Sequence, residues 1–408
     1  MKFTLRARWV LPIDAPPIEG GYVGVVAGRI AAVDGADPGL GPVNDLGDAV
    51  LLPGLVNAHT HLEFSGLAGP LGAPGMSLPA WIRLVIADRH RKLRDARAGI
   101  AAGLAESLAA GVTTLGEIAT APAGDYHPPN DGPQPTAVLF QEAIGFSAGR
   151  VDSAFADVER RLAATGGTPA GLSPHAPYTV HPRLLEKIVA LAAARRAPVA
   201  MHLAESREEL QLLADGAGDF RELLEERSMW DPAAIPRDAR PLDYLRLLAG
   251  APRSLVIHGN YLAEEEIAFL ADRRERMSVV YCPRTHAYFG HARYPLERML
   301  AAGVRVALGT DSRASNPDLN LLGELRAAAE FFPAIDPATM LRMATLDGAI
   351  ALGMGEHAGS LTRGKRADLV ALPCPAAVDP YGAILDGGAP TGVWLAGKIV
   401  GEMKPYSH

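Results

Sequence analysis

Short apolar runs in the middle of the chain alternate with stretches rich in Ala, Leu, Arg and Glu that have a helical period. This alternation extends from about residue 51 to residue 354. It is typical of βα units, in which each strand is followed by a helix that covers a parallel sheet. We count eight such runs, which predicts an α/β protein built on a (β/α)₈ TIM barrel.

The two ends of the chain have a different pattern. Both contain short β-like runs that are separated by Gly and Pro and have no helical period; these runs are residues 3–10, 22–26, 29–33, 367–372, 393–395 and 399–400. Because both ends are β-like and the middle is not, we expect the termini to pair into one small sheet domain. The predicted division is residues 1–50 with 356–408 for that domain, and 51–355 for the barrel.

Each predicted barrel strand ends in a group that can carry chemistry. In a barrel of parallel strands all carboxyl ends lie on one face, where such enzymes keep their active sites. Polar side chains from distant parts of the sequence are therefore expected to converge there. The groups at the strand ends are His59 with His61, Glu117, Glu142, His175, His202, His258, Cys282 and Asp311.

His59 and His61 are the first candidate metal ligands. They are two residues apart, so on an extended strand both imidazoles leave on the same face and can hold one ion. A His-x-His pair alone is weak evidence, since two hydrogen-bonded or solvent-facing histidines have the same pattern. The other histidines and Asp311 at strand ends favour the metal. Three imidazoles and one carboxylate, with a position left for water, suit a catalytic Zn²⁺ or Fe²⁺.

The lysines argue for one metal ion rather than two. The strand-end residues above resemble those of the amidohydrolase superfamily, whose binuclear branch has a carboxylated lysine that bridges two metals at a central strand end. Only Lys92 and Lys187 occur in the barrel segment, both in helical stretches, while the fourth strand ends in His175. We therefore predict a mononuclear site.

Composition excludes several other classes of protein. The 408 residues are 48% hydrophobic and 21% charged, with a net charge of −7, which gives no basic surface for nucleic acid. The charged N-terminus does not resemble a signal peptide, and no run reaches the roughly 20 apolar residues that span a bilayer. We expect a cytoplasmic protein without nucleic-acid or membrane partners. Cys282 and Cys374 are too few for a disulfide framework.

Several motifs together resemble the amidohydrolase superfamily, in its mononuclear branch of ring aminohydrolases. They are Leu52-Pro-Gly-Leu-Val-Asn-Ala-His-Thr-His, His202-Leu-Ala-Glu205, Ile257-His-Gly259, Gly309-Thr-Asp-Ser312 and a closing segment over residues 359–370. Within that branch the variant His-Thr-His-Leu-Glu-Phe-Ser is similar to aminodeoxyfutalosine and adenosine-derivative deaminases. The resemblance implies a distorted barrel with a small β-sandwich built from both termini.

The resemblance also implies roles for individual residues. The metal ligands would be His59, His61, His202 and Asp311. Glu205 would shuttle protons, and His258 would hold the attacking water or the substrate. A helix-start carboxylate is the alternative for Glu205, and a turn or cap is the alternative for Asp311. We prefer the catalytic roles, with Asp311 also acting as general base.

Five further residues are candidates for substrate binding. His175 resembles a substrate-contacting position, and Glu63 follows the His-x-His pair closely enough to reach an amino group or a ribose hydroxyl. Trp81 would cover the pocket, although an aromatic residue at helical spacing is more often part of the core. Arg284 and His286 stand where relatives carry uncharged residues, and would bind an acidic substituent of the substrate.

We therefore expect a hydrolase that uses one divalent metal, with zinc favoured over iron, to remove ammonia from a small aminated heterocycle. A purine nucleoside derivative is the expected substrate. Because activated water does not dictate the leaving group, hydrolysis of a cyclic amide or a carbon–halogen bond is the enzymatic alternative. A non-catalytic structural homologue is the alternative of another class, and a homo-oligomer is compatible with the sequence.

Overall fold

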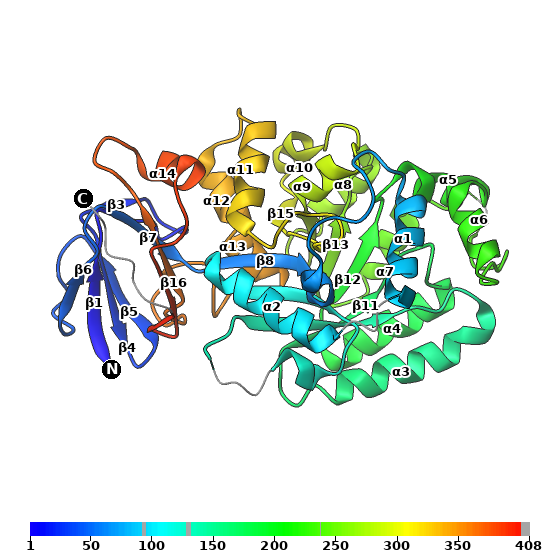
Figure 1. The fold of residues 1–408 in the computed structure, drawn as a ribbon, viewed down its shortest axis with the longest axis horizontal. Helices are drawn as coiled ribbons and strands as arrows, with labels where there is room; N and C mark the ends of the chain where they lie inside the picture. Colours follow the sequence, from blue (N-terminus) through cyan, green and yellow to red (C-terminus); the bar gives the residue numbers. More distant parts are fainter. Residues whose placement is uncertain (92–94, 128–131, 237, 401–408) are drawn as a thin grey trace.

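Eight parallel strands follow one another around a barrel in chain order, in a computed structural model that describes residues 1–91, 95–127, 132–236 and 238–400 (Figure 1). A parallel bridge between Thr60 and Asp311 brings the end of the last strand back to the first. The predicted barrel is thus confirmed, including all eight strand ends. The strands are β8 (Leu55–Thr60), β9 (Val112–Ala119), β10 (Thr136–Ala143), β11 (Ala170–Pro174), β12 (Val199–Leu203), β13 (Ser254–His258), β14 (Met277–Tyr281) and β15 (Arg305–Leu308).

Helices surround the barrel and connect its strands (Figure 1). The α-helices are α1 (Leu78–Arg91), α2 (Ala96–Ala109), α3 (Val151–Ala163), α4 (Pro182–Arg195), α5 (Arg207–Asp215), α6 (Asp219–Glu226), α7 (Pro241–Leu248), α8 (Glu264–Ala271), α9 (Pro283–Tyr288), α10 (Leu296–Ala302), α11 (Leu321–Phe331), α12 (Pro337–Met343), α13 (Leu346–Ala351) and α14 (Pro380–Asp386). Short 3₁₀ turns are η1 (Leu62–Gly66), η2 (Ala123–Tyr126) and η3 (Ala148–Arg150).

Strands from both ends of the chain form two small sheets beside the barrel (Figure 1). Their orders are β5-β4-β1-β6 and β18-β17-β16-β7-β2-β3. The antiparallel pairing of β7 with β16 joins the two ends, as expected from their common β-like pattern. The strands are β1 (Lys2–Arg6), β2 (Trp9–Val10), β3 (Ile18–Glu19), β4 (Tyr22–Val26), β5 (Arg29–Asp34), β6 (Val43–Asp45), β7 (Ala49–Pro53), β16 (Leu369–Pro373), β17 (Gly392–Leu395) and β18 (Lys398–Val400). The limits 1–50, 51–355 and 356–408 stay a prediction.

Alternation along the barrel strands decides which side chains reach the interior. In β12, Ala200 packs with Val56 and Ile118 from other strands, whereas Met201 belongs to the cluster that includes the surrounding helices. His202 has the same parity as Ala200, so its ring is directed to the barrel interior.

Helices α5 and α6 follow strand β12 and lie near α1 (Figure 1). The Ser206 hydroxyl caps α5 by accepting from the backbone N–H of Glu209, and α5 ends at Gly216 in the left-handed conformation. No helix within the described residues is long and apolar enough to cross a membrane.

Candidate active site

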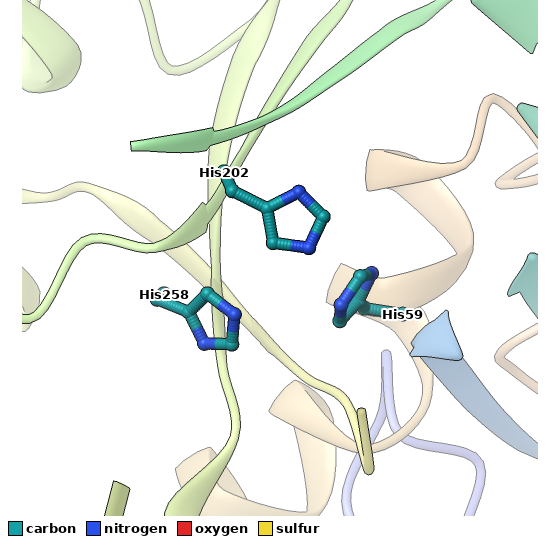
Figure 2. Close-up of side chains that lie close together, drawn as sticks. All are labelled: His59, His202 and His258. Carbon is teal, nitrogen blue, oxygen red and sulfur yellow. The ribbon is translucent and has the colours of Figure 1, made fainter. Parts of the chain in front are cut away.

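Histidines from three strand ends face one another at one end of the barrel. His59, His202 and His258 come from β8, β12 and β13, and their rings surround a common space (Figure 2). His61 lies beside them, with its Nε2 3.4 Å from the Nε2 of His202. The Asp311 Oδ1 is 3.6 Å from the His59 Nε2 and 3.7 Å from the His61 Nε2. The barrel thus brings together side chains that are more than 250 positions apart in sequence.

These side chains fit a divalent metal ion. Two groups of side chains that share His59 each place their possible ligand atoms within 4.8 Å of one another. The first group is His59, His202 and His258, and the second is His59, His61 and Asp311. Neither ring nitrogen of the buried His59 has a hydrogen-bond partner in the described structure, and the same holds for the His258 Nε2. Buried polar atoms normally have a partner. A metal ion satisfies such nitrogens.

The histidines are in the protonation state that metal binding requires. Burial, reinforced by neighbouring histidines, lowers the pKa of His59 and His61 well below its usual value. Burial also lowers the pKa of His202 to about 3. Imidazoles with such pKa values are neutral at physiological pH, and neutral imidazole is the form that ligates zinc or iron.

Hydrogen bonds to backbone groups orient the candidate ligands. The Nδ1 of His202 lies 3.0 Å from the His175 carbonyl oxygen, which leaves its Nε2 for the cluster. The Asn57 side chain bonds the side chain of Thr310 at 2.8 Å and its backbone N–H at 3.1 Å, and so ties β8 to the segment that carries Asp311. Asp311 itself has a left-handed backbone, φ 58°, which is uncommon for a residue other than Gly and is typical of functional sites.

Glu117 stabilises the other side of the His-x-His segment. Its buried carboxylate accepts hydrogen bonds from the Thr60 hydroxyl at 2.7 Å and from the Leu62 backbone N–H at 3.0 Å. These two residues flank His61, so Glu117 holds the backbone that positions that ring. The sequence placed Glu117 at a strand end but assigned it no role.

Glu205 lies next to the histidine cluster in a buried position. Its Oε1 is 3.4 Å from the Nε2 of His258, and its Oε2 accepts a hydrogen bond of 3.4 Å from the Tyr178 hydroxyl. Burial raises the pKa of Glu205 well above its usual value, and the charges of Asp311 and Glu209 add to that effect. A bound cation acts in the opposite direction. Glu205 is therefore placed to exchange a proton beside the metal cluster.

Glu209 holds the backbone of Glu205. Its two carboxylate oxygens accept from the backbone N–H groups of Ala204 and Glu205, both at 2.8 Å. Ala204 has a left-handed backbone, φ 52°. On the carbonyl side, the Asn260 side chain donates to the Glu205 carbonyl at 2.8 Å. The motif Glu205-Ser206-x-x-Glu209 resembles a capping box, which was the one sequence signal for this clamp.

A cavity of about 240 Å³ opens above the histidines. Its base contains the polar residues of the cluster, and its walls are mainly apolar side chains of α1 and α6. Among the residues that line it are Trp81, Ile82, Val85, Arg89, Glu142, His175, Tyr178, Leu223, Leu224 and Arg227. A small, mostly apolar cavity with a few polar groups is typical of a site for a small molecule.

The model of the amidohydrolase family matches residues 50–400. The chain belongs to the amidohydrolase family. The resemblance and the hydrolase class expected from its motifs are therefore confirmed.

Similar proteins narrow the comparison within the amidohydrolases. The chain is 33% identical over 397 residues to the 5-methylthioadenosine/S-adenosylhomocysteine deaminase of Moorella thermoacetica, covering 90% of this chain and 85% of that protein. It is 33% identical over 324 residues to the aminodeoxyfutalosine deaminase of Deinococcus radiodurans, covering 75% and 74%. The crystal structure of a zinc-bound adenosine deaminase from Xanthomonas campestris matches with a TM-score of 0.79 and 28% identity, covering 97% and 92%.

Two of the five predicted substrate-binding residues line the cavity of this amidohydrolase, namely Trp81 and His175. The Trp81 indole N–H donates to the Ala314 carbonyl at 3.0 Å, which fixes the ring in the wall. The His175 Nδ1 is 2.8 Å from the Thr179 hydroxyl oxygen. Glu63 does not line the cavity. It forms an ion pair of 2.5 Å with Arg89, and Arg89 is one of the lining residues.

The structure gives Arg284 and His286 partners within the protein and places neither in the cavity lining. The Arg284 guanidinium is 2.6 Å from Glu324 and 2.6 Å from Asp318. The His286 Nε2 is 2.9 Å from the Ala292 carbonyl oxygen. Since Pro283 starts helix α9, both side chains follow the geometry of that helix and not the strand end. Substrate contact by these two residues stays a prediction, and neither lines the cavity above the histidines.

Three charged residues of the cavity were missed as site residues, namely Arg89, Glu142 and Arg227. Glu142 was placed correctly at a strand end, but Arg89 carries no signal beyond its position in an amphipathic helix. Of the two barrel lysines, Lys187 is on α4 and pairs with the exposed Asp152 at 2.6 Å, away from the strand ends. Lys92 falls outside the described residues.

Proposed function

We propose that this amidohydrolase is a zinc-dependent deaminase that hydrolyses the amino group of an adenine-derived nucleoside to a carbonyl and releases ammonia. The observation that carries the proposal is the buried cluster of neutral histidines and Asp311, with Glu205 beside it at the base of a small cavity. The similarity to deaminases of adenine nucleosides supports the substrate class.

The ligands in this proposal are His59, His61, His202 and Asp311. A zinc ion held there supplies an acidified water as nucleophile. Zinc is favoured over iron by the zinc-bound structural relative.

The residues around the ligands have distinct tasks in the proposed reaction. Asp311 accepts a proton from the attacking water. Glu205 transfers a proton to the ring nitrogen next to the carbon that is attacked, which makes that carbon more electrophilic. His258, 3.4 Å from Glu205, hydrogen-bonds the oxygen that is added to the ring. The proton that Asp311 took from the water then passes to the amino group. Ammonia leaves as the carbon–oxygen double bond forms, and the proton of the added hydroxyl returns to Glu205.

Ammonia release from a panel of compounds tests the proposal. The purified protein, reconstituted with zinc, is expected to release ammonia from at least one of adenosine, 5′-methylthioadenosine, S-adenosylhomocysteine and aminodeoxyfutalosine. The same panel includes a cyclic amide and a chlorinated triazine, with carboxylate and chloride as readouts. Turnover of only these two would overturn the deaminase proposal and support the alternative leaving groups.

A further inference from the structure

Glu142 presents a carboxylate to the cavity that the proposed chemistry does not use. It lies at the C-terminal end of β10 and lines the cavity. Within the described part of the chain, the carboxylate accepts no hydrogen bond. Burial raises the pKa of Glu142, and the positive charge of Arg89 acts against that effect. Glu142 is partly exposed on the cavity side, so its two carboxylate oxygens are accessible to hydrogen-bond donors of a ligand in the cavity.

The backbone of Glu142 is held in place from the outside of the barrel. The Arg161 guanidinium of α3 donates to the Glu142 carbonyl and, at 3.2 Å, to the Ala119 carbonyl at the end of β9. An ion pair of 2.9 Å with Asp157 orients this arginine. The chain thus fixes the strand end while leaving the Glu142 carboxylate free on the cavity side.

Arg89 supplies hydrogen-bond donors next to this acceptor. Its guanidinium is 5.2 Å from the centre of the Phe64 ring and donates one hydrogen bond to Glu63. Arg89 and Glu142 attract each other, but no hydrogen bond joins them. Arg89 therefore keeps N–H groups for a ligand.

The charges around Glu142 favour a neutral ligand group that carries hydroxyls. Glu63 already balances the charge of Arg89, so a carboxylate placed here would be repelled by Glu142. Arg227 also lines the cavity, but from the exposed end of α6. Two neighbouring hydroxyls match the local groups, because they donate to the two carboxylate oxygens and accept from a guanidinium.

We propose that Glu142 and Arg89 bind the vicinal diol of the sugar in a nucleoside substrate, and that Glu63 acts only by holding Arg89. This inference rests on the proposed function and adds to it the group that recognises the sugar. Each hydrogen bond to a charged group contributes roughly tenfold or more in affinity, so the two hydroxyls together account for on the order of 100-fold.

A comparison of two substrates in matched variants tests the inference. For the zinc-loaded protein, kcat/KM for adenosine is expected to exceed that for 2′,3′-dideoxyadenosine by on the order of 100-fold, mostly through KM. In Glu142→Ala the ratio of the two kcat/KM values is expected to fall below about 5. Removing the carboxylate from the protein and removing the hydroxyls from the substrate delete the same hydrogen bonds, so the second change has little further effect. Glu142→Gln keeps one acceptor and is expected to give an intermediate ratio. It also carries the test if the alanine variant does not fold.

Two control variants separate recognition from general damage. Glu186→Ala removes an exposed carboxylate on α4 and is expected to leave the ratio unchanged. Glu63→Gln weakens the hold on Arg89 and is expected to reduce the ratio less than Glu142→Ala. A ratio that is the same in wild type and in both Glu142 variants overturns the inference. A preference for 3′-amino-3′-deoxyadenosine that depends on Glu142 also overturns it, in favour of a cationic group.

Binding separates failure of this inference from failure of the proposed function. If the wild-type protein releases no ammonia from any nucleoside, the deaminase proposal fails. Calorimetry with the same zinc-loaded proteins and the same two nucleosides then tests the sugar subsite alone. A preference for adenosine of on the order of 100-fold that is lost in Glu142→Ala supports the subsite. Equal binding of the two nucleosides, or no binding, overturns it.

Discussion

The base and the roof of the cavity are held together in different ways. At the base, ligands come from the ends of barrel strands, are buried, and are oriented by hydrogen bonds to backbone groups such as the His175 carbonyl. We use the term roof for the walls formed by α1 and α6, whose apolar side chains face the cavity. A partly exposed ion pair, Arg83 with Glu226 at 2.8 and 2.9 Å, connects these two helices.

This difference indicates which part of the cavity carries out the reaction and which part selects the substrate. Strand ends in a closed network of hydrogen bonds cannot move without breaking several buried interactions, which suits a metal site. Helices joined by apolar contacts and a surface ion pair can change shape or sequence at small cost. We expect changes to the histidine cluster, Glu205 and Glu209 at the base to lower kcat, and perturbations of the roof to change mainly the affinity for substrate.

The largest effect is expected from His202→Ala at the base. In the proposed zinc-dependent deaminase this variant loses a ligand from the cluster, so bound zinc and activity should both be lost, with kcat/KM falling by roughly 10⁴-fold or more. Metal content by mass spectrometry and ammonia release are the measurements. His357→Ala, at an exposed histidine, is the matched control and should keep both. Full zinc content in His202→Ala would show that this ring is not a ligand.

Glu205→Gln is expected to separate chemistry from metal binding. Because the amide cannot transfer the proton, kcat should fall by roughly 10²–10⁴-fold while zinc content and substrate binding persist. Steady-state kinetics and calorimetry measure the two properties. Glu208→Gln, at the partly exposed neighbouring carboxylate on α5, should leave kcat unchanged. A kcat close to wild type in Glu205→Gln would remove Glu205 from the mechanism.

Glu209 gives the base a pH dependence of stability. Burial raises the pKa of Glu209 from 4.5 to about 7. The native state therefore holds this proton more tightly than the unfolded state, so its contribution is fully present below pH 4.5 and is lost as the pH rises through about 7. At low pH the protonation of Glu209 contributes about 3 kcal/mol to the free energy of unfolding.

Melting curves of the zinc-loaded protein between pH 4.5 and pH 8 measure the Glu209 contribution. The stability of wild type relative to Glu209→Gln should decline over that range, because glutamine does not titrate. Glu209→Gln should also lower kcat by about tenfold, since one of the two clamped N–H groups loses its acceptor. The same change in melting temperature with pH in both proteins would contradict the raised pKa of Glu209.

The smallest effect is expected from Arg83→Ala in the roof. Loss of the ion pair with Glu226 should cost less than about 1 kcal/mol in the free energy of unfolding, because both side chains are partly exposed. KM should rise a few-fold while kcat stays the same, because only the spacing of α1 and α6 changes. Denaturant unfolding and kinetics are the readouts, with Arg293→Ala as the surface ion-pair control. A large fall in kcat would erase the distinction between base and roof.

Strand ends were the most predictable part of the molecule. The apolar runs ending in His175, His202 and His258 are short and sharply bounded, and parallel strands leave their ends on one face whatever the loops do. The histidine cluster could therefore be predicted without knowing a single contact. The pairing of the two termini followed from their shared β-like pattern for a similar reason.

Side chains one turn beyond the strand ends were not predictable in the same way. Arg284 and His286 follow β14 closely in sequence, yet the first is directed to Glu324 and Asp318 and the second to the Ala292 carbonyl. Glu63 is two residues from the candidate ligand His61, but its carboxylate forms an ion pair with Arg89. Proximity in sequence to a strand end does not determine the direction of a side chain once a helix or turn has begun.

The sequence by itself determined the barrel, the order of its strands and the polar group at each strand end, because hydrophobic periodicity is local and parallel strands share one polarity. Only the tertiary structure decided which charged groups meet in the cavity. Arg89 of α1 and Glu142 of β10 are 53 positions apart, and nothing local in either segment specifies that they line the same cavity. Their neighbourhood depends on how helices pack over the barrel, which is a property of the whole chain.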